Sequence, residues 1–248
     1  MKAFVNTHAL SSERFDSARL GVLAMIAHPL PQPGSYLGAV MDGEINVGRF
    51  LIDVQAEHTP GQVDLDLHRA RPGSAVSDRP AITYKLKTGG YLMLLVSQGA
   101  GGFRVVLDRV AEEKKGRDKA VATFDSTKLG KGDLFLVTLL RPGRWRMNEP
   151  GRGGEGTIVV SYPVPGKQAY RPAEPVWVKL RDRAFEPDKV QIGPAQTVVF
   201  AIETEPVSVV VSLGAADDGK GDRKPPTGVR RRVRWTNPSR KESPGRPK

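Results

Sequence analysis

Hydrophobic and polar residues alternate with a period of two along most of the chain after Pro33. Alternation of this kind is typical of strands that are buried on one face and exposed on the other. It predicts a series of short strands separated by turns rich in Gly and Pro, at residues 47–54, 63–67, 82–86, 91–96, 103–107, 120–124, 134–140, 145–147, 157–162, 176–180, 189–192, 197–202 and 207–213. Many short strands at this spacing indicate an all-β sandwich fold.

The first thirty residues carry the strongest helical pattern in the chain. Ser11 or Ser12 can cap a helix that Pro29 would end. The apolar residues of this helix would recur every three or four positions, at Phe15, Ala18, Val22 and Met25. An alternative is that the run from Leu20 to Ala27 is the apolar core of a signal-like segment. The expectation for residues 1–30 is therefore a short N-terminal helix or such a segment. No apolar run approaches the ~20 residues of a transmembrane helix, so none is expected.

The composition agrees with β structure and excludes several kinds of chemistry. Of the 248 residues, 39% are hydrophobic and 6% are aromatic, while Gly (27) and Pro (20) are frequent. The core must therefore rest on Val, Ile and Leu placed between many turns. The chain has no Cys, which excludes disulfides, thiolate catalysis and every metal centre that needs a Cys ligand.

Most of the net charge of +11 lies at the C-terminal end. Residues 214–248 hold eleven Lys or Arg against four Asp or Glu, a net charge of +7, which leaves +4 for residues 1–213. This basic tail has several Pro and almost no large apolar residue, so it is predicted to be disordered. Its most distinctive feature is a polyanion-binding candidate with four guanidinium groups beside an indole: Arg230, Arg231, Arg232, Arg234 and Trp235.

Two stretches share a pattern of turn residues, aromatic residues and strand alternation. The first runs from Phe185 through Pro187 and Gly193 to residues 197–200, and the second from residues 140–145 to 156–160. They resemble the beginning and the end of a cupredoxin domain, the Greek-key β-sandwich of plastocyanin-like proteins. The resemblance implies that Phe185 plugs one end of a sandwich and that Pro187 precedes an edge strand.

The order of the two stretches implies two domains, because the stretch that resembles a domain's end comes first. The expected fold is a tandem pair of Greek-key, cupredoxin-like β-sandwiches. Residues 75–162 would form the first sandwich. Residues 34–70 would join residues 173–213 in the second, because the hairpin at 45–68 is needed to cover an edge that would otherwise stay open.

No metal or other cofactor is expected. The stretches that match the copper-binding segments of cupredoxins, residues 204–210 and 147–155, lack both Cys and His, so type 1 copper is excluded. The four His lack the spacing of a preformed metal site and are expected in structural or surface positions: His8, His28, His58 and His68. One alternative is that His58 and His68 approach across the hairpin and hold a metal together with Glu57, Asp64 or Asp66.

No set of residues with catalytic spacing stands out, and the Gly-rich stretches lack the context of phosphate-binding loops. The first hypothesis is therefore a non-enzymatic, cupredoxin-like protein without type 1 copper. It would act as a binding or structural module, with a protein or an anionic polymer as its partner. The alternatives are a nucleic-acid-binding protein that uses the basic tail and, less favoured, a metal-handling protein that uses the N-terminal His. The sequence leaves open the oligomeric state, and it slightly favours a cytoplasmic over an exported protein.

Overall fold

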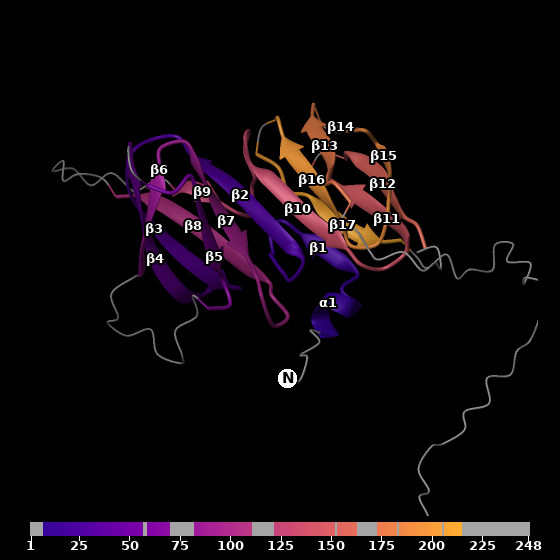
Figure 1. Ribbon diagram of the computed structural model, residues 1–248, viewed down its shortest axis with the longest axis horizontal. Helices are drawn as coiled ribbons and strands as arrows, with labels where there is room; N and C mark the ends of the chain where they lie inside the picture. Colours follow the sequence, from indigo (N-terminus) through magenta and orange to yellow (C-terminus); the bar gives the residue numbers. More distant parts are fainter. Residues whose placement is uncertain are drawn as a thin grey trace, which may run out of the picture. The chain divides into compact units, whose positions relative to one another are not determined.

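A computed structural model describes residues 7–56, 59–69, 82–110, 122–151, 153–162, 173–182, 184–204 and 206–214. The expected all-β class is confirmed for these residues, which form strands and one helix of five residues (Figure 1). The prediction of a disordered basic tail concerns residues 214–248, and all of these but Gly214 lie outside the described residues. The elements are α1 (Thr7–Ser11), β1 (Arg14–Asp16), β2 (Ala24–Leu30), β3 (Gly34–Asp42), β4 (Ile45–Gln55), β5 (Gln62–Asp66), β6 (Ile82–Lys87), β7 (Gly90–Leu95), β8 (Phe103–Arg109), β9 (Ala122–Asp125), β10 (Leu134–Leu139), β11 (Gly143–Asn148), β12 (Glu155–Val160), β13 (Val176–Arg181), β14 (Ala184–Glu186), β15 (Lys189–Ile192), β16 (Gln196–Ile202) and β17 (Val210–Leu213).

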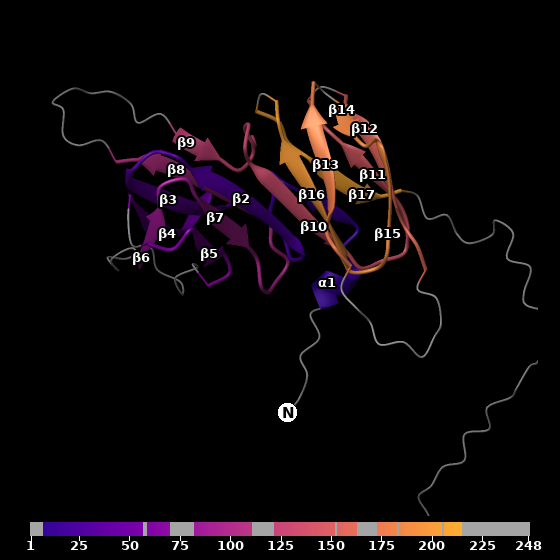
Figure 2. The same ribbon diagram turned by 45° about the horizontal axis from the view of Figure 1, so that its top comes forward.

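The strands form three sheets. Two have five strands each, in the orders β6-β4-β3-β8-β9 and β1-β17-β11-β12-β15, and the third has seven, in the order β14-β13-β16-β10-β2-β7-β5. In Figure 1 the strands of the seven-stranded sheet lie side by side from β14 to β5, and Figure 2 shows the same order after a turn of the view. The antiparallel pairing of β2 with β10 joins two halves into this single sheet.

One hydrophobic cluster runs between the sheets. Phe135, Val137 and Leu139 project from one face of β10 into this cluster and are fully buried. On β2, the ring of His28 lies 4.0 Å from the ring of Phe124 on β9, which belongs to a five-stranded sheet. The seven-stranded sheet therefore packs one of its faces, here called the inner face, against the other sheets in the manner of a sandwich.

The expected assignment of residues 34–70 to the strands at 173–213 is wrong. β4 pairs with β3 and β6, and β5 pairs with β7, so neither strand pairs with the strands after residue 173. β4 and β5 also lie in different sheets and do not form the predicted hairpin. Alternation predicts which residues are strands but not their partners, because pairing depends on which buried faces meet in three dimensions.

The expected helix over residues 11–29 is also wrong. The helix α1 ends at Ser11, and the residues that follow form β1 and then β2. β2 lies between β10 and β7, where both of its edges are hydrogen-bonded. The run from Leu20 to Ala27, interpreted as a signal-like core, instead supplies buried residues, among them Leu20, Val22 and Ile26. A strand with apolar residues on both faces has no clear period of two, and so its short runs can match a helical spacing.

The chain contains an internal repeat that the strand pattern alone did not reveal. Phe15-Asp16-Ser17 recurs as Phe124-Asp125-Ser126, each followed three residues later by Leu-Gly. At the same spacing, Pro33-Gly34 recurs as Pro142-Gly143. The structural details also recur. Gly34 and Gly143 both have positive φ, and the next aromatic residue donates a hydrogen bond to a backbone carbonyl four residues earlier in each copy, Tyr36 to Gln32 (2.9 Å) and Trp145 to Arg141 (3.1 Å).

Strand pairing is the same in the two copies. β2 pairs antiparallel with β7, which pairs parallel with β5. β10 pairs antiparallel with β16, which pairs parallel with β13. In the five-stranded sheets, the order β6-β4-β3-β8 matches β15-β12-β11-β17, with the same parallel and antiparallel contacts. The two halves are therefore copies of one arrangement, joined about the pair formed by Ile26 and Phe135.

The first strand of each copy belongs to the sheet of the other copy. β1 pairs with β17 at the far end of the chain, and β9 pairs with β8 of the first copy. A buried Ser fixes each exchanged strand. The Ser17 hydroxyl accepts the Val209 N–H and the Ser126 hydroxyl accepts the Val105 N–H, both at 2.9 Å.

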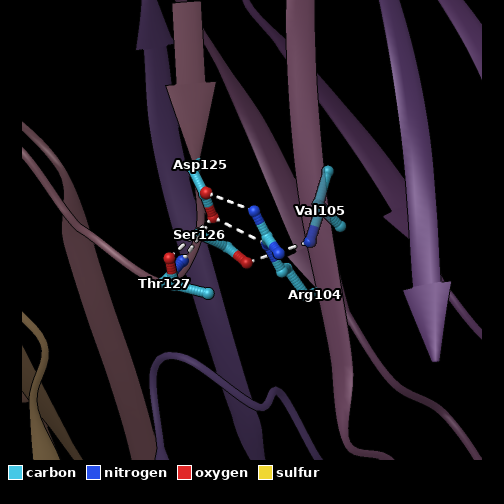
Figure 3. A network of polar contacts seen from close by, with 5 residues as sticks. All are labelled: Arg104, Val105, Asp125, Ser126 and Thr127. Carbon is cyan, nitrogen blue, oxygen red and sulfur yellow. Dashed lines mark hydrogen bonds and ion pairs between the residues drawn. The ribbon is translucent and has the colours of Figure 1, made fainter. Parts of the chain in front are cut away.

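An ion pair reinforces the exchanged strand β9 (Figure 3). Arg104 on β8 donates to both carboxylate oxygens of Asp125, at 3.0 and 2.6 Å, and the Thr127 N–H and hydroxyl donate to the same carboxylate. Burial raises the pKa of the Asp125 carboxyl, but the hydrogen bonds from Arg104 and Thr127 lower it more. The pKa therefore lies below its ordinary value of 3.8.

We expect Asp125→Asn to lower the free energy of unfolding by about 2 kcal/mol near neutral pH, because it removes charge-assisted hydrogen bonds. A carboxyl with a lowered folded pKa stabilises the fold fully above its unfolded pKa, and this contribution is lost as pH falls through the folded pKa. The difference between wild type and variant in urea unfolding should hence be constant above the ordinary pKa and shrink below it. Asp188→Asn, at an exposed position just before β15, is the control and should change little. If the stability difference between wild type and Asp125→Asn stayed the same in acid, the lowered pKa of Asp125 would be contradicted.

Candidate interaction face

The face of the seven-stranded sheet that points away from the hydrophobic cluster, here called the outer face, is the candidate functional surface. Its side chains alternate with the inner, fully buried ones along each strand. The central five strands carry mostly apolar residues on this face, together with two cations on β13: Trp177, Lys179 and Arg181 on β13, Thr197, Val199 and Ala201 on β16, Leu134, Leu136 and Thr138 on β10, Met25, Ala27 and Pro29 on β2, and Tyr91, Met93 and Leu95 on β7.

The strand register arranges these residues in rows across the sheet. One row runs through neighbouring strand partners in the order Trp177, Val199, Leu136, Met25, Leu95 and Asp66. The next row runs in the order Lys179, Ala201, Leu134, Ala27, Met93 and Asp64. Each row is thus apolar over four central strands and carries a carboxylate on the edge strand β5.

Ala27 and Val199 distinguish the outer face from the core. Both are nearly inaccessible, at 2% and 3%, yet neither belongs to the hydrophobic cluster between the sheets. The larger neighbours in their rows are half-buried, while Trp177 is 56% exposed and Tyr91 39% exposed. A contiguous apolar surface that stays partly accessible to solvent is typical of a contact surface.

Charged residues border the outer face on both sides. On β13, Lys179 and Arg181 follow Trp177 on the same side of the strand, and both bind Glu203, with Lys179 Nζ at 3.0 Å and Arg181 Nε at 2.9 Å. The hydrogen bonds from Arg181 and Lys179 lower the pKa of the Glu203 carboxyl. Glu203 therefore stays ionised in mild acid and holds the two cations beside the apolar rows.

The opposite border is acidic. Asp64 and Asp66 lie on the same face of β5, because they occupy alternate positions of the strand. Asp66 accepts hydrogen bonds from the Ser97 hydroxyl at 2.5 Å and from the His68 N–H at 3.1 Å. Asp64 is exposed and accepts a hydrogen bond from the Gln62 amide.

A shallow, open depression of about 590 Å³ lies at one end of the outer face. Its lining joins Leu134 and Ala201 of the second row, and Tyr91 beside that row, to Arg181 and Glu203 at the cationic border. The depression is therefore lined by apolar and charged residues together, a combination that suits a protruding side chain of a binding partner.

Beneath this end of the face, partly buried His28 pairs with buried Asp133. His28 Nδ1 lies 2.7 Å from Asp133 Oδ1, and the other carboxylate oxygen accepts the Gly130 N–H at 2.7 Å. Asp133 is 2% exposed and the His28 ring packs on Phe124. These contacts tie β2 to the turn that precedes β10, and so they fix the seam between the two halves of the sheet.

The residues that the sequence analysis singled out as candidate binding or metal-site residues do not come together in the described structure. The polyanion-binding candidates all lie outside the described residues: Arg230, Arg231, Arg232, Arg234 and Trp235. His58 and Glu57 also lie outside them, and the side chain of His8 is not described. His68 is half-buried after β5, next to Gly99. Within the described ranges, no group of three or more side chains of the kinds that bind metals comes together.

Sequence reasoning missed the outer face. A signal was present, because the segments 24–27, 91–95 and 134–137 are apolar at consecutive positions rather than at alternate ones. In a sheet with one solvated face, such a run means that both faces of the strand carry apolar side chains. Three such strands adjacent in one sheet place an apolar surface on the outside.

In the part of the chain that the structure covers, no helix is long and apolar enough to cross a membrane. A comparison of the chain with family models, with curated proteins and with solved structures finds no match.

Proposed function

We propose that this protein is a non-enzymatic binding or structural module that contacts a protein partner through the outer face of its seven-stranded sheet. The observation that carries the proposal is the pair of apolar rows, which cross four neighbouring strands on the side away from the core. Leu and Met side chains that remain partly exposed on a sheet face favour aggregation unless a partner covers them.

The chemistry of the border supports a protein partner. Trp177 lies on the same side of β13 as Arg181, and Trp and Arg are among the residue types that contribute most to binding energy at protein interfaces. The depression at the end of the rows offers a pocket for one protruding side chain. Flexible Met25 and Met93 can adapt to the shape of a partner.

The cupredoxin-like, Greek-key description of the sandwich is part of the same proposal. Phe185 supports it, because this residue is 3% exposed and its ring meets that of Phe200 edge-on, with centroids 5.9 Å apart. A buried ring at the start of a strand is what the resemblance implies for a residue that plugs one end of a sandwich.

Site-specific photo-crosslinking tests the proposal. Leu136→p-benzoylphenylalanine places a photoreactive group in the middle of the outer face, and Ile45→p-benzoylphenylalanine places the same group on β4, where Ile45 is 68% exposed. We expect an adduct with one defined protein from the Leu136 position only. Adding Met25→Glu on the neighbouring strand should remove it, because a carboxylate in the row opposes desolvation. No adduct from the Leu136 position, or equal adducts from both, would overturn the proposal.

A further inference from the structure

We infer that the partner of the outer face is a second copy of this chain, bound face to face about a two-fold axis that runs along the strands at the β2–β10 seam. This inference rests on the proposed function and names the occupant of that surface. Its basis is that the two rows become complementary to themselves under this rotation.

The rotation superposes each row on the same row of the second copy in reversed order. Along the second row, Leu134 then faces Ala27 of the partner subunit, and Ala201 faces Met93 of the partner subunit. Each large side chain therefore meets a small one. In the first row, Leu136 faces Met25 of the partner subunit, so that flexible Met fills the remaining space. Facing positions that alternate in size interdigitate well across paired sheets.

The same rotation pairs the charges at the borders. Lys179 stands at one end of its row and Asp64 at the other, so each Lys179 faces Asp64 of the partner subunit. Lys179 can turn from Glu203 without leaving that carboxylate unpaired, because Arg181 also binds Glu203. An axis across the strands would instead bring like charges together, which selects the axis along the strands.

The area is sufficient for a weak, specific dimer. The rows span six strands about 4.8 Å apart and about five residues of 3.4 Å each, so the face measures about 29 Å by 17 Å. A face-to-face pair then buries about 1,000 Å² in total, near the lower end for specific interfaces. We therefore expect a dimer that dissociates in the micromolar range.

The test measures the oligomeric state of the full chain by sedimentation equilibrium over a wide concentration range. Leu136→Glu should weaken dimerisation by at least about thirtyfold, since it buries a charge at the centre of the interface. Ile45→Glu, on an exposed apolar residue of another sheet, is the matched control and should leave the dimer unchanged.

A charge-swap cycle tests the orientation. Asp64→Lys and Lys179→Glu should each weaken the dimer by about tenfold, since each places like charges face to face. The double variant carrying both substitutions should restore it, because Lys at 64 then faces Glu at 179 of the other copy. Circular dichroism of every variant checks that the fold is kept, which is expected because both positions are exposed.

The outcomes separate this inference from the proposed function. A monomer at all concentrations, or single and double charge variants that dimerise equally weakly, would overturn the two-fold dimer. If the Leu136 crosslink in cells then joined a different protein, the outer face would still be a binding surface and the proposed function would stand. If no crosslink formed at Leu136 either, both would fail.

Discussion

Replacing a facing Gly–Phe pair by the Met–Gly pair that occupies the equivalent positions of the second copy should preserve the fold, although each single substitution severely destabilises it. On β3 and β4, Gly38 faces Phe50, and a Cβ on Gly38 would lie 2.1 Å from the Phe50 ring. In the second copy the equivalent pair is reversed: Met147 faces Gly156, and a Cβ on Gly156 would lie 2.4 Å from Met147. The same space is filled from opposite strands in the two halves.

We expect Gly38→Met to lower the free energy of unfolding by about 3 kcal/mol, because the added side chain overpacks the site. Phe50→Gly should lower it by about 4 kcal/mol, because it leaves a cavity. The double variant should cost less than either single one, since it reproduces the pair found in the second copy. Chemical denaturation of the four proteins measures this coupling. Gly193→Ala, where a Cβ would meet no neighbour, is the control for the backbone effect of removing a Gly. Additive costs in the double variant would show that the two halves do not share this packing arrangement.

Truncating one aromatic residue should weaken the half of the molecule that is distant in sequence. Phe15 on β1 is 4% exposed and packs on Trp145, with ring centroids 5.7 Å apart, although Trp145 belongs to the second copy. Phe15→Ala should lower stability by about 3–4 kcal/mol, the usual cost of deleting a buried ring. Because β1 pairs with β17, hydrogen exchange should accelerate most in β17 and β11.

The equivalent substitution in the other copy is the matched control. Phe124 on β9 is 5% exposed, and β9 pairs with β8. Phe124→Ala should therefore accelerate exchange in β8 and β3 and leave β17 as in the wild type. If Phe15→Ala instead loosened β3 and β8, the exchange of first strands between the two halves would be wrong.

Much of the local structure follows from the sequence. The alternation around β4, β5, β6 and β8 predicted those strands within a few residues, because a side-chain period of two places one face in the core whatever the partner strand is. The pairing of these strands could not be predicted in the same way. β4 and β5 are neighbours in sequence with a turn between them, yet they belong to different sheets.

The prediction of a helix in the N-terminal segment was wrong for a related reason. β2 is apolar on both faces, because its inner side chains meet the core and its outer ones form part of the outer face. A run of that kind has no period of its own, so the four apolar residues from Phe15 to Met25 could be fitted to a helix. What makes the segment a strand is the pair of neighbours, β7 and β10, which satisfy its backbone hydrogen bonds.

The candidate functional surface, too, could be predicted from the sequence only in part. The sequence by itself determined an all-β chain without Cys, the common face of Asp64 and Asp66, and a basic segment with a net charge of +7. It also contained the repeated Phe-Asp-Ser segments, which are legible without any structure. Only the tertiary structure decided that β1 and β9 exchange partners and that Met25, Leu136 and Trp177 lie in one row. The physical reason is that composition and the period of two describe each strand by itself and not which strands lie beside it. A surface made of five strands exists only once long-range hydrogen bonding has fixed their order and register.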